Sequence, residues 1–239
     1  MQTGNKSDNN LTAQVEGLLD IAIINALVIE KDFYQTKYLD DAYYILGMSS
    51  FYKNRITAAE YYFRTLIDIF PNTSYLNNVN IQMGFIELKI GKINDFEKRI
   101  DFILIKDLNN EEKYNYYNLI AYYYEYYNDY NNINENYLKA VEYADSKQKR
   151  FYIYNKLLEF SESSNNILNS VNYIEKIQDN NISNSIDRDL LIKWIKYHHI
   201  LNNHNDVLDK MKLYLEDART LKDKLFYSIG IARANIYMK

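Results

Sequence analysis

"YYILGMSSFYKNRITAAEYYFRTLIDIFP", from Tyr43 to Pro71, is the stretch that decides the fold. It pairs Leu46 with Gly47, places Ala59 twelve residues after the glycine and Phe63 four residues after the alanine, and ends at the single proline. Self-similarity at a fixed interval is the signature of repeat architectures, and this pattern recurs elsewhere in the chain.

The pattern returns at intervals of 37 residues. One step from Gly47 reaches Gly84, preceded by Met83, in "NIQMGFIELKIGKINDF", where Gly91 falls at the expected turn between two helices. A second step reaches Ala121, preceded by Ile120. Later steps rest on helical apolar spacing and on polar loops such as "SESSNN" and "NNHND", and they reach Leu158, Ile195 and Ala232.

These residues resemble the tetratricopeptide repeat, a helix-turn-helix unit in which small residues let two antiparallel helices approach and an aromatic residue fills the space between them. Two positions depart from the family: Tyr43 stands where tryptophan is frequent, and Ser50 where tyrosine is usual. The interval of 37 exceeds the usual 34 and implies longer helices. The resemblance implies an all-α, right-handed solenoid of stacked antiparallel helix pairs.

The same register predicts how the chain is organised. One step before Ala59 and Phe63 lie Ala22 and Ala26, which indicates a second helix that lacks its first. We expect residues 1–10 to be a flexible polar lead. Residues 11–239 are expected to form one solenoid with an odd N-terminal helix, five helix pairs and a closing helix.

A narrower resemblance concerns "LIDIFPNTSYL", which is similar to unit endings in envelope lipoproteins that support outer-membrane β-barrel assembly. It implies a bacterial, lipoprotein-like protein on the periplasmic side of the cell envelope in preference to the cytoplasm. "MQTGNKSDNN" lacks the apolar core of a signal peptide, as a processed or trimmed N-terminus also would.

Composition narrows the classes of function. One proline and six glycines are too few for a β-sandwich or barrel, so helices are expected. A net charge of -4 without a basic run argues against nucleic acid as a partner. The absence of cysteine excludes disulfides and thiolate metal sites. The longest apolar stretch, Leu18 to Ile29, is too short to span a membrane and predicts a buried helix.

The run "YNYYNLIAYYYEYYNDYNN", from Tyr114 to Asn132, is rich in tyrosine, which packs in interiors as readily as it contacts ligands. On a helix from about Glu111 to Asn128, the helical spacing places Tyr117, Ile120, Ala121 and Tyr124 on one buried face. Tyr114 and Tyr127 are expected to lie in the seams between neighbouring repeats. Two rings, Tyr122 and Tyr126, are expected to line the concave groove, with Asn118 more loosely beside them.

The resemblance and the interval together predict a partner-binding groove on the first helices. Its expected residues are Tyr44, Met48, Phe51, Tyr52, Ile81, Phe85, Leu88, Tyr122 and Tyr126. Toward the C-terminus the same face becomes polar, with Asn155, Glu159, Glu162, Lys196 and His199. Exposed apolar surface usually marks an interface. The alternative is that the odd N-terminal helix covers this groove.

The sequence offers little for catalysis or metal binding. His198 and His199 are adjacent on a helix and point about 100° apart, so with His204 they are not expected to form a metal site. Positions equivalent to a chaperone-tail clamp hold Tyr44, Met48 and Gln82. Trp194 is expected in the core. No phosphate loop, zinc-protease motif or nucleophile elbow occurs.

We therefore expect a non-enzymatic scaffold or adaptor, without cofactor or metal, that holds a peptide segment or helix of another protein in its groove. Two alternatives remain open: a homo-oligomer joined through the C-terminal helix, and a small-ligand receptor.

Overall fold

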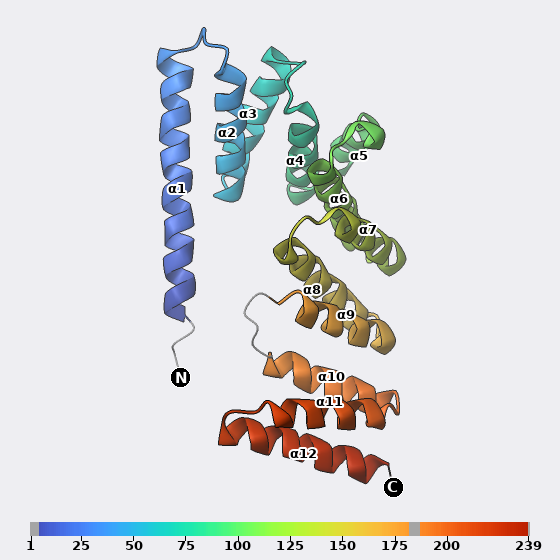
Figure 1. Ribbon diagram of the computed structural model, residues 1–239. Helices are drawn as coiled ribbons and strands as arrows, with labels where there is room; N and C mark the ends of the chain where they lie inside the picture. Colours follow the sequence, from blue (N-terminus) through green and yellow to red (C-terminus); the bar gives the residue numbers. More distant parts are fainter. Residues whose placement is uncertain (1–4, 182–186, 239) are drawn as a thin grey trace. The chain divides into compact units, whose positions relative to one another are not determined.

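The computed structural model describes residues 5–181 and 187–238, and in this part of the chain it is all-helical and contains no strand (Figure 1). The all-α fold class is confirmed. The twelve α-helices and one 3₁₀ helix are α1 (Asn5–Asp32), α2 (Leu39–Tyr52), α3 (Ile56–Ile69), α4 (Leu76–Lys89), α5 (Ile93–Asp101), η1 (Ile105–Asp107), α6 (Asn110–Tyr127), α7 (Tyr130–Tyr143), α8 (Lys147–Ser163), α9 (Ile167–Asp179), α10 (Arg188–Ile200), α11 (His204–Glu216) and α12 (Leu221–Tyr237).

The chain divides into two compact units, the first ending at Leu119 and the second beginning at Ile120, inside α6. In unit 1, α2 packs against α1 and α3, and α4 packs against α3 and α5. In unit 2, α8 packs against α7 and α9, and α12 packs against α10 and α11. Helices adjacent in the sequence are thus adjacent in space within each unit, as short connections favour.

Five turns between helices share one backbone geometry. The residue at the turn has a positive φ, between 53° and 76°, in each of Asn54, Gly91, Asn128, Asn165 and Asn202, which follow one another at intervals of 37 residues. The next N–H donates to a carbonyl five residues earlier, as from Arg55 to Ser50 at 2.8 Å and from Asn203 to His198 at 2.8 Å. This is the left-handed C-terminal cap for which glycine and asparagine are suited. The predicted turn at Gly91 is confirmed.

The core of unit 1 lies between α2, α3 and α4. Phe63 and Met83 are fully buried in one apolar cluster with eleven further partly or fully buried side chains of the same helices and their neighbours. A Cβ atom added to Gly47 would lie 2.4 Å from the Phe63 ring, so only glycine lets the ring approach α2 this closely. The predicted close approach of two helices at Gly47 is confirmed.

Gly84 of α4 lies at a second close approach. A Cβ atom there would lie 2.7 Å from Leu119 of α6 and 3.5 Å from Phe96 of α5. The glycine thus receives side chains from two neighbouring helices, and its predicted position at a helix contact is confirmed.

The N-terminal helix α1 packs on α2 through Ala26, which is buried with Ala42 and Leu46. Asp20 forms an ion pair with Lys53 at the end of α2, with 2.7 Å between Nζ and Oδ1, and α1 continues beyond that point (Figure 1). Helix α1 therefore packs on Ala42 and Leu46. The alternative prediction placed this helix over the predicted groove residues.

Helix α1 begins at Asn5, so residues 5–10 belong to a helix, whereas the sequence predicts a flexible lead. Helix formation is compatible with this stretch because it contains no proline or glycine after Gly4. The prediction for residues 1–4 lies outside the described residues. Among the residues that are described, no helix combines the length and hydropathy needed to cross a bilayer.

The core of unit 2 repeats the same buried positions with other side chains. Ile133, Ile174, Val207 and Met211 are fully buried, on α7, α9 and α11. Trp194 of α10 is buried as predicted, and its Nε1–H donates to Glu175 at 3.0 Å.

Unit 1 also contains a buried ion pair that was not predicted from the sequence. Glu87 of α4 is fully buried and accepts two hydrogen bonds from Arg99 of α5, at 2.6 Å and 2.9 Å. Arg99 also donates to Asn80 at 2.8 Å. Twelve residues separate the two charges, and only the turn at Gly91 brings them together.

Candidate functional site

The tyrosine run lies only partly in the interior: of the face predicted to be buried, Ala121 is buried, whereas Tyr117, Ile120 and Tyr124 are half-buried. Tyr114 and Tyr116 of α6 are buried and Ala121 is fully buried, whereas Tyr122 and Tyr126 are exposed, Tyr126 by 65%. Tyr127 is also exposed, and its ring packs edge-on against Tyr126 with 5.2 Å between centroids. Tyr127 was predicted to lie between neighbouring repeats. Its ring is exposed because the residue is the last of α6.

The predicted groove residues of α2 are largely used for packing within unit 1. The Tyr44 ring stacks on Tyr75 with 4.1 Å between centroids, and Met48 and Phe51 pack against the core around Phe63. Burial raises the pKa of the Tyr44 hydroxyl to about 12. Tyr52 alone of this set is widely exposed.

On α4 the prediction needs correction. Ile81 is fully buried and Leu88 is only 7% exposed, so neither presents a surface to a partner, and Phe85 is half-buried. The reason is that α4 has packed neighbours on several sides, including α3, α5 and Leu119 of α6, which leaves little of it open.

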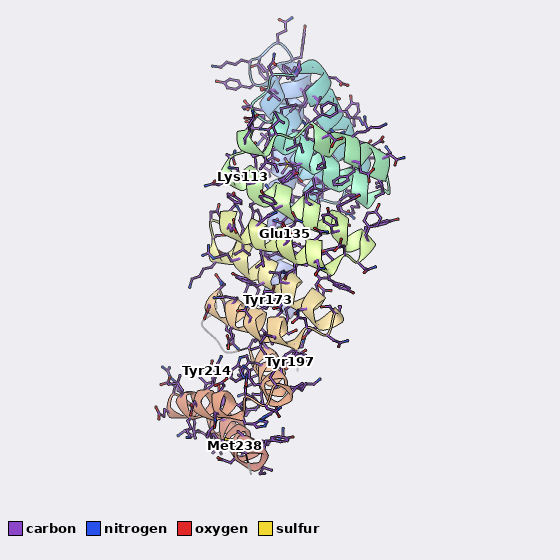
Figure 2. The ribbon with its side chains drawn as sticks, turned by 90° about the vertical axis from the view of Figure 1, so that its right-hand side faces the viewer. Lys113, Glu135, Tyr173, Tyr197, Tyr214 and Met238 are labelled. Carbon is purple, nitrogen blue, oxygen red and sulfur yellow. The ribbon has the colours of Figure 1, made fainter. Side chains whose placement is uncertain are left out.

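An open groove lies in unit 2, between α10 and α12, with a volume of about 930 Å³. In Figure 2 this region lies around the labels Tyr197 on α10 and Met238 just beyond α12. Its walls are Ile192, Ile195, Lys196, His199 and Ile200 from α10 and Phe226, Ile229, Gly230, Arg233, Ile236 and Tyr237 from α12. Its apolar side chains are accessible: Ile192 is 50% and Ile229 45% exposed.

The walls of this groove stand at 37-residue equivalents of the binding face predicted on α2, in the C-terminal part of that face, which the sequence predicts to be polar. Four steps of 37 residues from Tyr44, Met48, Phe51 and Tyr52 reach Ile192, Lys196, His199 and Ile200. Five steps reach Ile229, Arg233, Ile236 and Tyr237. Lys196 and His199 were predicted on this face. The α12 wall was not predicted, although the same interval, counted one step further into the closing helix, reaches it.

The side chains of the groove that can carry charge near neutral pH are all basic or imidazole. Lys196, His199 and Arg233 line it, and no carboxylate does. The described residues place no carboxylate within ion-pair distance of Lys196 or Arg233, although Lys193 nearby is paired with Glu162 at 2.9 Å. The groove is therefore an apolar trough with a positive rim.

Two of the three histidines meet, a contact that the sequence does not predict. The Nδ1 atoms of His199 and His204 are 2.8 Å apart, and both rings pack against Tyr237, with 4.6 Å and 5.3 Å between centroids. The prediction considered two adjacent residues of one helix. It missed that the left-handed turn at Asn202 folds the first residue of α11 back onto α10.

The third histidine lies beneath the groove. His198 is buried against Trp194, with ring centroids 3.9 Å apart, and a carboxylate oxygen of Asp206 lies 3.5 Å from Nδ1. Burial lowers the pKa of His198, and burial together with the neighbouring His204 lowers the pKa of His199. The charged form of both imidazoles is thus disfavoured. Within the described residues, no three histidine or acidic side chains are grouped as a metal site requires.

No protein-family model matches this chain, and no curated protein matches it in sequence. The groove between α10 and α12 is therefore interpreted from its own geometry and chemistry.

Proposed function

We propose that the chain is a tetratricopeptide-like repeat protein that acts as a non-enzymatic scaffold, and that the α10–α12 groove holds a segment of a partner protein. One observation carries the proposal. Eight of the eleven residues lining the groove stand at positions that the 37-residue interval relates to the binding face predicted from α2. The left-handed turns at the same interval support the repeat, and repeats of the family that it resembles stack their helix pairs into a solenoid.

The shape of the groove favours a peptide or helix as its occupant. Two roughly parallel walls contributed by α10 and α12 leave a trough lined by isoleucines, and an amphipathic helix buries its apolar face in such troughs. Exposed apolar surface of this kind usually marks an interaction site. The trough shows no convergent set of catalytic groups, which is what an enzymatic role would need.

An unbiased selection of peptides tests the proposal. Random 15-residue peptides displayed on phage are selected on the full-length protein, and the affinities of the enriched peptides are measured by fluorescence anisotropy. The variant Ile229→Ala removes a side chain of the groove. We expect it to weaken binding about thirtyfold if the residue is an anchor, which corresponds to about 2 kcal/mol.

The matched control is Leu213→Ala on α11, which removes an equally exposed side chain that does not line the groove. It should leave the affinity unchanged. Peptides that bind both variants and the unaltered protein equally well would refute the groove as the binding site.

A homo-oligomer is the second candidate, because α12 exposes Leu221 and Leu225 outside the groove, by 84% and 61%. Sedimentation equilibrium would reveal it, and Leu225→Glu would then dissociate the assembly. A role in outer-membrane protein assembly, suggested by "LIDIFPNTSYL", stays a prediction.

A further inference from the structure

The charges of the α10–α12 groove restrict which segments it can accept. Lys196 and Arg233 are exposed on opposite walls, and His199 adds an imidazole on the α10 wall. Arg233 is close enough to act electrostatically on His199. An apolar segment that carries lysine or arginine would meet repulsion at this rim, whereas one that carries carboxylates would find partners on both walls.

The histidine pair offers a hydrogen-bond donor. In a neutral pair one Nδ1 donates and the other accepts, and each ring carries a single proton. When His199 accepts at Nδ1, its proton is on Nε2, and that atom is buried without a hydrogen-bond partner among the described residues. A buried donor without a partner costs free energy in the free protein.

A further proton can join the pair without breaking it. If His199 is protonated on both nitrogens, its Nδ1–H donates to the neutral His204, so the 2.8 Å contact is retained and the groove gains a positive charge. The groups that act on His199 are His204 from α11, Arg233 from α12 and His198 on its own helix, and all three disfavour this charge in the free protein.

We propose that the groove selects partner segments in which acidic side chains stand beside apolar ones, and that protonation of His199 tightens this binding as the pH falls from 8 to 6. The inference rests on the proposed function, because it names the chemistry of the segment that the groove holds. The occupant is a protein segment with glutamate or aspartate beside its apolar anchors.

The direction of the pH effect follows from linkage. Burial and the neighbouring positive groups lower the pKa of His199 in the free protein, and a bound carboxylate raises it again. The complex then binds more protons than the free protein, so affinity increases as the pH falls. Each pKa unit restored gives at most about a tenfold gain in affinity. The partner's own carboxylates stay ionised above about pH 5, since their ordinary pKa is about 4.

The selected peptides test both parts. We expect acidic residues to be enriched beside apolar ones, and the affinity to be higher at pH 6 than at pH 8, by up to about tenfold. Replacing the glutamates of a selected peptide with glutamine should remove most of the affinity and the whole pH dependence. The double variant Lys196→Gln, Arg233→Gln should lose the preference for acidic peptides, while Lys212→Gln, outside the groove on α11, should keep it.

His199→Phe supplies the sharpest readout, because it keeps an aromatic ring beside Tyr237 and removes the titratable group. It should bind the acidic peptides with an affinity that does not change between pH 8 and 6, and thermal melting would show whether it is folded. If it fails to fold, the glutamate-to-glutamine peptides decide the same question on the unaltered protein.

The two proposals fail in different ways. Selected peptides that lose affinity with Ile229→Ala but carry no acidic residues, or bind equally at both pH values, would overturn this inference and leave the binding groove in place. Peptides that are insensitive to Ile229→Ala would remove the groove itself.

Discussion

The pair α2 and α4 in unit 1 and the pair α10 and α12 in unit 2 use equivalent positions in opposite ways. On α2, the Tyr44 ring stacks on Tyr75, which directly precedes α4. The counterparts of Tyr44 four and five steps later, Ile192 and Ile229, are half exposed and border a groove of about 930 Å³. In unit 1 a neighbouring ring covers this position, and in unit 2 the position borders open space. What packs beside the position thus decides whether it is interior or surface.

The two units also differ in whether a buried polar side chain at an equivalent position is hydrogen-bonded. Glu87 of α4 and His198 of α10 lie three steps of 37 residues apart, and both are buried polar side chains. Glu87 is held by two hydrogen bonds from Arg99, whereas neither nitrogen of His198 has a hydrogen-bond partner among the described residues. Unit 1 satisfies its buried polar group, and unit 2 places an unsatisfied one under its groove.

The largest expected effect tests this second contrast. Arg99→Met should destabilise the protein by about 3 to 5 kcal/mol, because it leaves the buried Glu87 carboxylate without its partner. His198→Phe removes polar atoms without hydrogen-bond partners and should be neutral or stabilising. Urea unfolding of both variants measures the difference. Arg64→Met, which removes one member of an exposed pair with Glu60, is the control and should cost less than about 1 kcal/mol. Equal costs at Arg99 and Arg64 would contradict the contrast.

Overpacking at a glycine should have the next largest effect. Gly47→Leu forces a side chain into the Phe63 ring, which is fully buried, and should cost about 3 kcal/mol. In unit 2, Gly230 approaches Met211, whose flexible side chain can move aside, so Gly230→Ala should cost less than about 1 kcal/mol. Gly17→Leu, with open space around it, should not destabilise. The urea midpoints would rank the three variants, and a reversed order for Gly47 and Gly230 would show that unit 2 is the tighter one.

Substitutions at the equivalent residues Tyr44 and Ile192 should change the stability less. Tyr44→Ala removes a ring stacked in unit 1 and should cost about 2 kcal/mol. Ile192→Ala should cost less than about 1 kcal/mol, because half of that side chain is already in water. Thermal melts of the two variants would test this. A large loss with Ile192→Ala would mean that the isoleucines of α10 support the fold and do not border an open groove.

The smallest expected effect is a loss of stability in mild acid that occurs in unit 2 and not in unit 1. The folded pKa values of His198 and His199 lie below the ordinary value of the unfolded chain, so the stability that they contribute is present above about pH 6.5 and is lost as the pH falls. All three histidines are in unit 2. Hydrogen exchange at pH 7 and pH 5, corrected for intrinsic rates, should show loss of protection in unit 2 alone. Equal loss in both units would assign the effect to carboxylates.

Much of this arrangement is readable from the sequence, and the reasons are local. Gly47, Gly84 and Gly91 are informative because close packing and a positive φ exclude most other residues. Asn54, Asn128, Asn165 and Asn202 carry the same information at the same interval. These four turns were not predicted, because asparagine is common in this chain and only the position of an asparagine indicates that it forms a turn.

Other features depend on contacts between distant residues. That Ile81 is interior while Ile192 is exposed cannot be read from two identical side chains, because it depends on what packs beside each helix. The pairing of Glu87 with Arg99 and of His199 with His204 likewise depends on how a turn closes. Periodicity predicts which positions are equivalent, and only the packed neighbours decide which of them remain open.

The shared left-handed turn also makes the chain editable in whole modules. Residues 54, 91, 128, 165 and 202 occupy the same point of the same backbone geometry. Deleting the residues between two such points, or duplicating them, would rejoin the chain at a junction whose dihedral angles already match. The turn is thus a natural splice point, where recombination can lengthen or shorten the protein by one helix pair without asking any residue at the seam to adopt a new conformation.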